Sequence, residues 1–190
     1  MQLLLLKENN MIYFTSDCHF SHDKEFLWGP RGFKNQWEMN EKIIENWNAI
    51  IQPDDDVYIL GDIVLSDTDG GIAALKQLKG KIHIIRGNHD SDARITLYKD
   101  CWNVVEVCDG KFLKVGKQTF FLSHYPCLTS NFDADKPLNR RIINLCGHTH
   151  SQDRWLDFDK GLIYHVEMDA HGCKPVSAEQ IINEIKEKTQ

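Results

Sequence analysis

The sequence feature that most constrains the fold is the stretch from Lys81 to Asp90, where an apolar run ends abruptly in polar residues. The apolar part, Ile82 to Ile85, is typical of a buried strand. The sequence Gly-Asn-His-Asp follows at once, at positions 87–90. Asparagine, histidine and aspartate are residue types that bind metal ions or transfer protons. The pattern therefore predicts a buried strand that presents chemically active side chains at its carboxyl end.

The same pattern occurs at four other places along the chain. Each time, an apolar run ends in aspartate or histidine, and the residues concerned are Asp17 and His19, Asp62, His124, and His148 and His150. A single polar residue after a strand is usually a turn residue or a satisfied polar group. Five such endings in one chain indicate a shared site where the strands end. The alternation of strand side chains predicts that Asp17 and His19 point to one side, as do His148 and His150.

Taken in order, these motifs resemble those of the calcineurin-like metallophosphoesterases. They are Asp-x-His at 17–19, Gly-Asp at 61–62, Gly-Asn-His-Asp at 87–90, a lone His at 124 and Gly-His-x-His at 147–150. The resemblance extends from residue 11 to about residue 176, and the small bacterial and phage phosphoesterases are the branch most similar in size. It implies an α+β fold, in which a two-layer β-sandwich is flanked by helices in the order αββα. It also implies a two-metal site at the strand ends.

The family resemblance assigns a role to each residue of these motifs. It implies that Asp17, His19 and His150 bind one metal, that Asn88, His124 and His148 bind the other, and that Asp62 bridges both. The implied reaction is in-line attack on phosphorus by a hydroxide that bridges the metals. His89 would be the general acid that protonates the leaving oxygen, and Asp90 is the candidate residue to orient His89.

The composition of the ligand set restricts the metal. Imidazole nitrogens and carboxylate or amide oxygens without thiolate suit manganese, iron, zinc or nickel, and Mn²⁺ is the ion we expect. Seven ligands are too many for one tetrahedral ion, whereas two divalent ions would use them all.

The substrate is less well determined than the metal site. Leu65 stands where phosphoprotein phosphatases of this family carry a second acid in Gly-Asp-x-x-Asp, which argues against kinship with those enzymes. The chain has no large insertions, so we expect an open site and a phosphodiester substrate. The alternatives are a phosphomonoesterase of a small metabolite and a non-catalytic metal-binding scaffold of the same fold.

Two further residues near the first motif are candidates for substrate binding. His22 could contact the substrate or stabilise its loop. Arg31 could hold a phosphate with two hydrogen bonds or could be a solvated surface residue. His165 and His171 follow no ligand spacing and are predicted to be structural or surface residues.

Composition restricts the class of protein. The length of 190 residues and the 42% apolar content predict one domain, residues 1–190, with its core in 11–176. Residues 1–10 could be an N-terminal extension or an edge strand. The net charge of −6 argues against a general nucleic-acid or membrane-surface binder. The short apolar run near the start lacks the features of a signal peptide or a membrane span, so we expect a cytoplasmic protein with free thiols. The oligomeric state stays open.

Periodicity predicts the main elements. Residues 36–50 have the spacing of an amphipathic helix, and the chain as far as residue 85 reads as a βαβαβ unit with a parallel sheet. After it, the short alternating runs 104–107, 112–115 and 119–122 predict an antiparallel half. Residues 125–141 are predicted to be a loop with one helical turn, and residues 177–188 a final helix.

Overall fold

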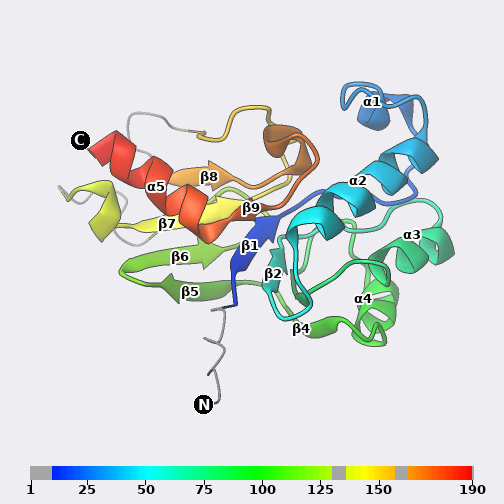
Figure 1. The fold of residues 1–190 in the computed structure, drawn as a ribbon, viewed down its shortest axis with the longest axis horizontal. Helices are drawn as coiled ribbons and strands as arrows, with labels where there is room; N and C mark the ends of the chain where they lie inside the picture. The colour runs from blue at the N-terminus through cyan, green and yellow to red at the C-terminus, as the bar shows by residue number, and fades with distance from the viewer. Residues whose placement is uncertain (1–9, 130–135, 157–161, 190) are drawn as a thin grey trace, which may run out of the picture.

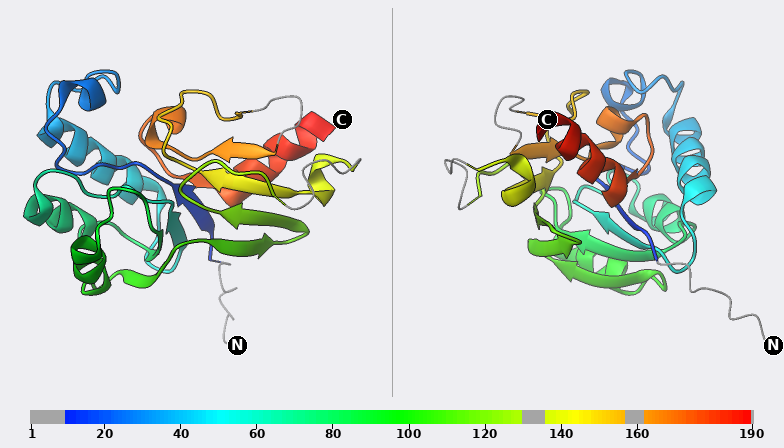
Figure 2. Two further views of the ribbon diagram at one scale, coloured as in Figure 1. Left: turned by 180° about the vertical axis from the view of Figure 1, so that it is seen from behind. Right: turned by 60° about the vertical axis from the view of Figure 1, so that its left-hand side comes forward.

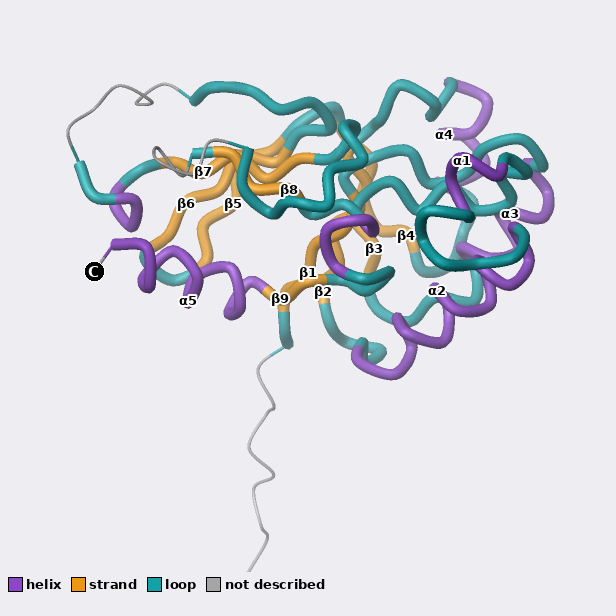
Figure 3. Tube along the Cα trace, turned by 90° about the horizontal axis from the view of Figure 1, so that it is seen from above, coloured by secondary structure: helices purple, strands orange, loops and turns teal. Residues whose placement is uncertain are grey.

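The computed structural model describes residues 10–129, 136–156 and 162–189, in which two β-sheets pack together with helices outside them (Figure 1). Helices α2 to α4 lie on the side of one sheet, and α5 lies along the other half of the molecule (Figures 2 and 3). The predicted two-layer sandwich flanked by helices is confirmed. The segment 1–10, predicted to be an extension or an edge strand, lies outside the described residues except for Asn10.

The first sheet contains the predicted parallel unit. Its strands, in spatial order, are β4 (Val104–Cys108), β3 (Lys81–Ile85), β2 (Asp56–Ile59), β1 (Ile12–Thr15) and β9 (Val176–Ser177). Strands β1 to β4 are parallel, and β9 is antiparallel to β1. The crossover helices are α2 (Gln36–Ile50), α3 (Thr68–Leu75) and α4 (Asp92–Lys99). Helix α2 has the predicted bounds, whereas α4 was not predicted and extends the parallel unit by one strand.

The second sheet differs from the prediction. Its order is β5 (Lys111–Val115), β6 (Gln118–Leu122), β7 (Ile142–Cys146) and β8 (Ile163–His165). The β5–β6 pair is the predicted antiparallel hairpin, but β6 pairs with β7 and β7 with β8 in parallel. The prediction that this half is antiparallel was therefore wrong in part. It was also wrong for the run 104–107, because β4 pairs in parallel with β3 of the first sheet. Short alternating runs fit either orientation, and only the connections decide between them.

The remaining elements are short, except the last helix. They are α1 (Glu25–Trp28), η1 (Leu138–Arg140), η2 (Met168–His171) and α5 (Ala178–Thr189). The turn η1 agrees with the one helical turn predicted in 125–141, of which residues 130–135 lie outside the described ranges. The hydroxyl of Ser177 accepts a hydrogen bond from the backbone N–H of Gln180 and caps α5. No helix in the described part of the chain combines the length and apolar content of a membrane span.

The first sheet separates two apolar clusters. One lies between this sheet and helices α2 to α4, where Met39, Ile43 and Trp47 of α2 are fully buried. The other joins Phe14 of β1 to Phe120 of β6, between the sheets. Because strands β1 to β3 are covered on both faces, they are apolar runs without strict alternation. The loops at their carboxyl ends are therefore held by a close-packed base.

Candidate metal centre

The loops that follow five of the strands bring all seven predicted ligands together. Those after β1, β2 and β3 carry Asp17, His19, Asp62 and Asn88, and those after β6 and β7 carry His124, His148 and His150. Side chains from residues 17 and 150, or 88 and 148, meet although they are far apart in the sequence. The site is thus a product of the two-sheet arrangement.

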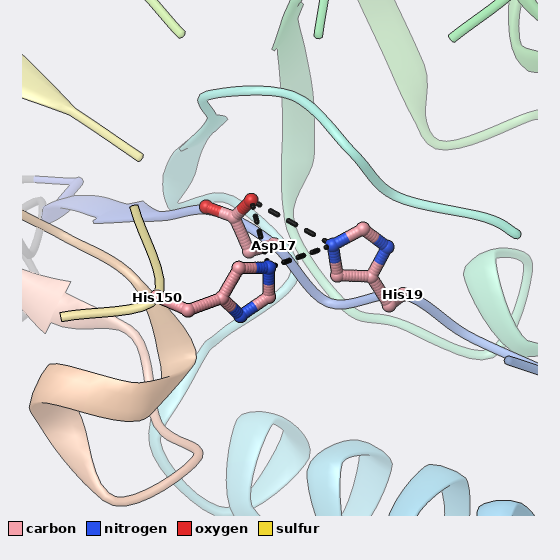
Figure 4. A group of neighbouring side chains, drawn as sticks. All are labelled: Asp17, His19 and His150. Atoms are coloured by element: carbon pink, nitrogen blue, oxygen red, sulfur yellow. Dashed lines mark hydrogen bonds and ion pairs between the residues drawn. The ribbon is translucent and has the colours of Figure 1, made fainter. Parts of the chain in front are cut away.

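Asp17, His19 and His150 form the first cluster (Figure 4). The Nε2 atoms of His19 and His150 are 3.2 Å apart and lie 3.7 and 3.9 Å from Oδ1 of Asp17. Ligand atoms that share one ion at about 2.1 Å are separated by roughly 3–3.5 Å, so a small contraction would suit a metal. Oδ1 of Asp17 is also buried without a hydrogen-bond partner among the described residues, which fits an atom that binds a cation.

The second cluster contains Asn88, His124 and His148. Oδ1 of Asn88 lies 2.8 Å from Nε2 of His124 and 3.0 Å from Nδ1 of His148. Nε2 of His124 is also 3.4 Å from Oδ2 of Asp62. One oxygen and two imidazole nitrogens therefore converge with a carboxylate, as in the first cluster, and they fit a second ion.

Asp62 connects the two clusters. Its Oδ2 atom lies 3.4 Å from Nε2 of His124 and 3.9 Å from Nε2 of His19. Its Oδ1 atom accepts a hydrogen bond of 2.9 Å from the backbone N–H of His89. Burial raises the pKa of the Asp62 carboxyl, but the hydrogen bonds from His124 and from the His89 backbone lower it below its ordinary value. The group between the clusters is therefore an anion at neutral pH.

Contacts behind the clusters set the tautomers of two histidines. Nδ1 of His124 donates to the carbonyl of Leu60 at 2.8 Å, and Nδ1 of His150 donates to Oδ2 of Asp169 at 3.0 Å. Each Nε2 atom therefore faces its cluster. Burial holds the pKa of His19 well below its ordinary value, so this ring is neutral. For His124, burial acts downward, but the Asp62 hydrogen bond and the Asp17 charge raise its pKa to about 9, so metal binding there displaces a proton.

Left-handed backbone geometry aims the ligands inward. Five of them have positive φ angles, namely Asp17 (56°), His19 (48°), Asp62 (54°), His148 (76°) and His150 (52°). Strand β1 ends at Thr15 and β7 at Cys146, so these ligands lie on loops beyond the strands. The predicted alternation of strand side chains is therefore not the reason why they point to the same side. Aspartate and histidine tolerate this region better than most residues, but it still costs free energy. The packed base beneath the loops maintains the strained conformation.

Two motif glycines leave room for the carboxylates. A Cβ atom on Gly147 would lie 2.3 Å from Oδ2 of Asp17, and one on Gly87 would lie 2.2 Å from Oδ1 of Asp62. Neither distance is possible between real atoms. The glycines of Gly-Asn-His-Asp and Gly-His-x-His are therefore explained by close approach to Asp17 and Asp62.

Asp90 does not orient His89, contrary to the sequence prediction. Its two oxygens accept hydrogen bonds from four donors, which are the backbone N–H groups of Asp62, Ile63 and Gly87 and the hydroxyl of Tyr98. The side chain is buried, and none of these hydrogen bonds involves the His89 ring. Asp90 therefore joins the loops after β2 and β3 and fixes the backbone that carries Asp62.

We expect Asp90→Asn to lower the free energy of unfolding by about 2–3 kcal/mol, because an amide NH₂ would then face two donors. The measurement is urea unfolding of the metal-free protein. Asp92→Asn is the matched control, because Asp92 forms an exposed pair with Arg86 and should cost under about 1 kcal/mol. Equal losses in the two variants would contradict the structural role of Asp90.

Arg31 fits neither of its two sequence predictions, a phosphate-binding residue or a solvated surface residue. Its side chain is 2% exposed, and Nε and Nη2 donate to the two oxygens of Asp169 at 2.9 and 2.7 Å. Nη2 also donates to the carbonyl of Asp17 at 2.8 Å. Burial raises the pKa of Asp169, but hydrogen bonds from His150 and Arg31 hold it well below its usual range. Arg31 therefore supports two ligands of the first cluster, Asp17 through its backbone and His150 through Asp169.

Arg31→Met should weaken metal binding by about 10- to 100-fold, as expected for the loss of a group behind the ligands. At saturating metal, the KM for substrate should stay close to that of the wild type. The measurements are metal titration calorimetry and steady-state kinetics, with Arg154→Met as the control because Arg154 forms an exposed pair with Glu184. A raised KM with unchanged metal affinity would restore Arg31 as a substrate-binding residue.

His22 lies beside the first cluster. Its side chain is buried, Nδ1 lies 2.9 Å from the hydroxyl of Ser66, and its ring is 5.9 Å from that of His19. Of the two sequence interpretations, the contact with Ser66 favours stabilisation of the loop.

Sequence reasoning missed the acidic residues behind the His148–His150 loop. Glu167 is fully buried, and its Oε1 atom accepts from the backbone N–H and hydroxyl of Thr149 at 2.9 and 2.8 Å. His165, also buried, lies 3.2 Å from the same oxygen, consistent with a structural residue. A signal was present, because Glu167 and Asp169 follow β8 as the predicted ligands follow their strands. The carboxyl end of β8 therefore supplies side chains that hold ligands from other strand ends in place.

Comparisons with known proteins identify chains that are similar to this one. A family model described as the calcineurin-like phosphoesterase superfamily domain matches residues 11–164. An uncharacterized protein from Methanocaldococcus jannaschii is 33% identical over 180 residues, which cover 92% of this chain and 91% of that protein. The gene 66 protein of Mycobacterium phage L5 is 29% identical over 201 residues, covering 93% of this chain and 96% of its own.

Two solved structures share the fold. A protein of unknown function from Aquifex aeolicus superimposes with a TM-score of 0.69 at 23% identity, over 93% of this chain and 100% of that one. A novel archaeal phosphodiesterase superimposes with a TM-score of 0.51 at 19% identity, over 84% of this chain and 86% of its own.

Proposed function

The chain belongs to the calcineurin-like phosphoesterase superfamily and therefore hydrolyses phosphate esters, and we propose that its substrates are phosphodiesters cleaved with two divalent metal ions. The observation that carries this proposal is the pair of ligand clusters joined by Asp62. Water adds to phosphorus, the bond to the leaving oxygen breaks, and the products are a phosphomonoester and an alcohol.

The donor set supports two metal ions, with Mn²⁺ as the first candidate. Asp17, His19 and His150 would hold one ion, and Asn88, His124 and His148 the other, with Asp62 between them. When bound, the ions would offset the charge of the phosphoryl oxygens and lower the pKa of a water molecule that attacks phosphorus. The carboxylates of Asp17 and Asp62 would supply negative charge beside the two cations, and the Nδ1 hydrogen bonds of His124 and His150 orient the Nε2 atoms of both rings toward the site.

His89 is the proposed general acid. Its side chain is 43% exposed, and its Nε2 atom lies 4.0 Å from Oδ2 of Asp62. The backbone on both sides of the ring is held, because the N–H donates to Asp62 and the carbonyl accepts from Nη1 of Arg94 at 2.6 Å. The backbone of His89 is thus hydrogen-bonded to Asp62, while the ring is exposed to a bound substrate. In this position the ring can donate a proton to the leaving oxygen.

The preference for diesters rests on charge and access. Asn88, His89, His148 and His150 are exposed and form the mouth of the site. A monoester carries more negative charge than a diester, and a site that selects it gains from an additional cationic side chain. Arg31, the arginine that follows the first motif in the sequence, forms an ion pair with Asp169 instead. An open mouth also leaves space for a second ester group.

The test compares bis-p-nitrophenyl phosphate with p-nitrophenyl phosphate at saturating Mn²⁺. We expect kcat/KM to be higher for the diester. A higher value for the monoester would favour the phosphomonoesterase alternative. Hydrolysis of neither compound by protein that binds two metal ions would favour a non-catalytic scaffold.

A further inference from the structure

Tyr125 is an exposed aromatic residue in direct contact with the second cluster. Its side chain is 51% exposed, although it follows the buried ligand His124. Its ring centroid lies 4.6 Å from that of His148 and 5.1 Å from that of His124, at interplanar angles of 65° and 72°. Because His148 is itself part of the mouth, the exposed portion of the Tyr125 ring lies at the edge of the site.

The turn that carries Tyr125 is held in place from beneath. The hydroxyl of Ser123 donates to the carbonyl of Tyr125 at 2.8 Å and accepts from Nδ2 of Asn144 at the same distance. Oδ1 of Asn144 accepts from the backbone N–H of Cys127, also at 2.8 Å. Asn144 is a fully buried residue of β7. The backbone that carries the ring is therefore positioned before any substrate binds, which lowers the entropy cost of using the ring.

The proposed general acid, His89, lies on the side of the first cluster. The ring of His89 is 5.7 Å from that of His19, which is 5.9 Å from His22. Phe26, 73% exposed, packs against His22 at 5.7 Å. The leaving group must reach His89 to receive its proton, so it belongs on this side. The ester group that stays on phosphorus is then left to face the second cluster and Tyr125.

We propose that Tyr125 is a specificity-determining residue that stacks on a planar group in the retained arm of the phosphodiester, such as the base of a nucleoside. The inference rests on the proposed function and specifies its substrate class. A fixed, half-exposed aromatic ring offers a face to any flat ring, and stacking of this kind tolerates different bases. The substrate class is therefore a small phosphodiester with an aromatic ring on the arm that remains bound to phosphorus.

The experiment uses two diesters with the same leaving group. They are p-nitrophenyl thymidine 5′-phosphate, whose retained arm carries a base, and p-nitrophenyl ethyl phosphate, whose retained arm is a short alkyl group. In the wild type, kcat/KM should favour the thymidine ester. Tyr125→Leu should reduce this preference by roughly 5- to 20-fold, mainly through KM, whereas Tyr125→Phe should retain it.

Two control variants separate stacking from damage to the site. Phe26→Leu should change both esters equally and leave the preference unaltered, because they share the p-nitrophenyl arm. Phe112→Leu removes an exposed aromatic side chain that packs on Phe121 of the second sheet, and it should change neither ester.

The possible outcomes test the role of Tyr125 separately from the hydrolysis of phosphodiesters. Equal kcat/KM for the two esters in the wild type, or a preference that survives Tyr125→Leu, would overturn the role of Tyr125 while leaving diester hydrolysis intact. Cleavage of p-nitrophenyl phosphate alone would overturn the diester function and the inference together, because a monoester has no retained arm.

Discussion

Asp62→Ala is expected to lower metal occupancy and to reduce kcat/KM by roughly 10²- to 10³-fold, the range for loss of a fixed electrostatic group. Oδ2 of Asp62 lies between His124 and His19, at 3.4 and 3.9 Å, so its charge acts on both clusters. Without that anion, two cations held close together repel each other with less compensation. The measurement combines metal analysis of the dialysed protein with kinetics at saturating Mn²⁺.

Asp62→Asn separates the effect of the bridging charge from the effect of the loop conformation. The asparagine oxygen can still accept the backbone hydrogen bond from His89, so the loop should keep its conformation while the bridging charge is lost. Asp54→Ala removes a carboxylate that is 83% exposed, and it should alter neither occupancy nor rate. Full occupancy by both metals in Asp62→Ala would show that Asp62 is not the bridge.

His89→Asn should leave both metals bound and reduce the rate by an amount that depends on the leaving group. The loss should be about 10²- to 10⁴-fold for an alkyl ester, whose alkoxide leaves poorly without a proton. It should be much smaller for a p-nitrophenyl ester, because p-nitrophenolate leaves well unprotonated. The measurement is kcat/KM for an aryl and an alkyl ester in wild type and variant, with metal content determined alongside.

Asn88→Ala is the comparison for His89→Asn. Asn88 contacts His124 and His148, so its loss should remove metal and depress both esters more evenly. Equal losses on both esters by His89→Asn with the metals retained would make His89 a charge stabiliser. Loss of metal in His89→Asn would make it a ligand.

Local sequence patterns predicted which residues could form the site, and they predicted much of the first sheet. Apolar runs that end in aspartate, asparagine or histidine are local patterns, and each was visible without knowing its neighbours in space. The apolar spacing of α2 and the βαβαβ order are equally local. Even so, Trp37, an apolar residue in the first turn of α2, is 67% exposed, because packing determines which apolar residues of the helix are buried.

Helix α4 was missed although its start carried a signal. The hydroxyl of Ser91 accepts from the backbone N–H of Arg94, as an N-cap does, and Asp92 lies in the first turn. Its apolar face is weak, because Tyr98 is its one buried residue. A short helix with so little to bury leaves hardly any periodicity in the sequence.

The partners of the polar groups depend on contacts between distant segments of the chain. Arg31 pairs with Asp169, 138 residues away, and Asp90 accepts from Asp62 and Ile63 on another loop, so neither performs the role that its neighbours in sequence suggested. The parallel pairing of β6, β7 and β8 and the left-handed ligand residues are likewise set by packing. Local sequence encodes which side chains are available, whereas burial and hydrogen bonding between distant segments determine which of them face the metal site and which support it.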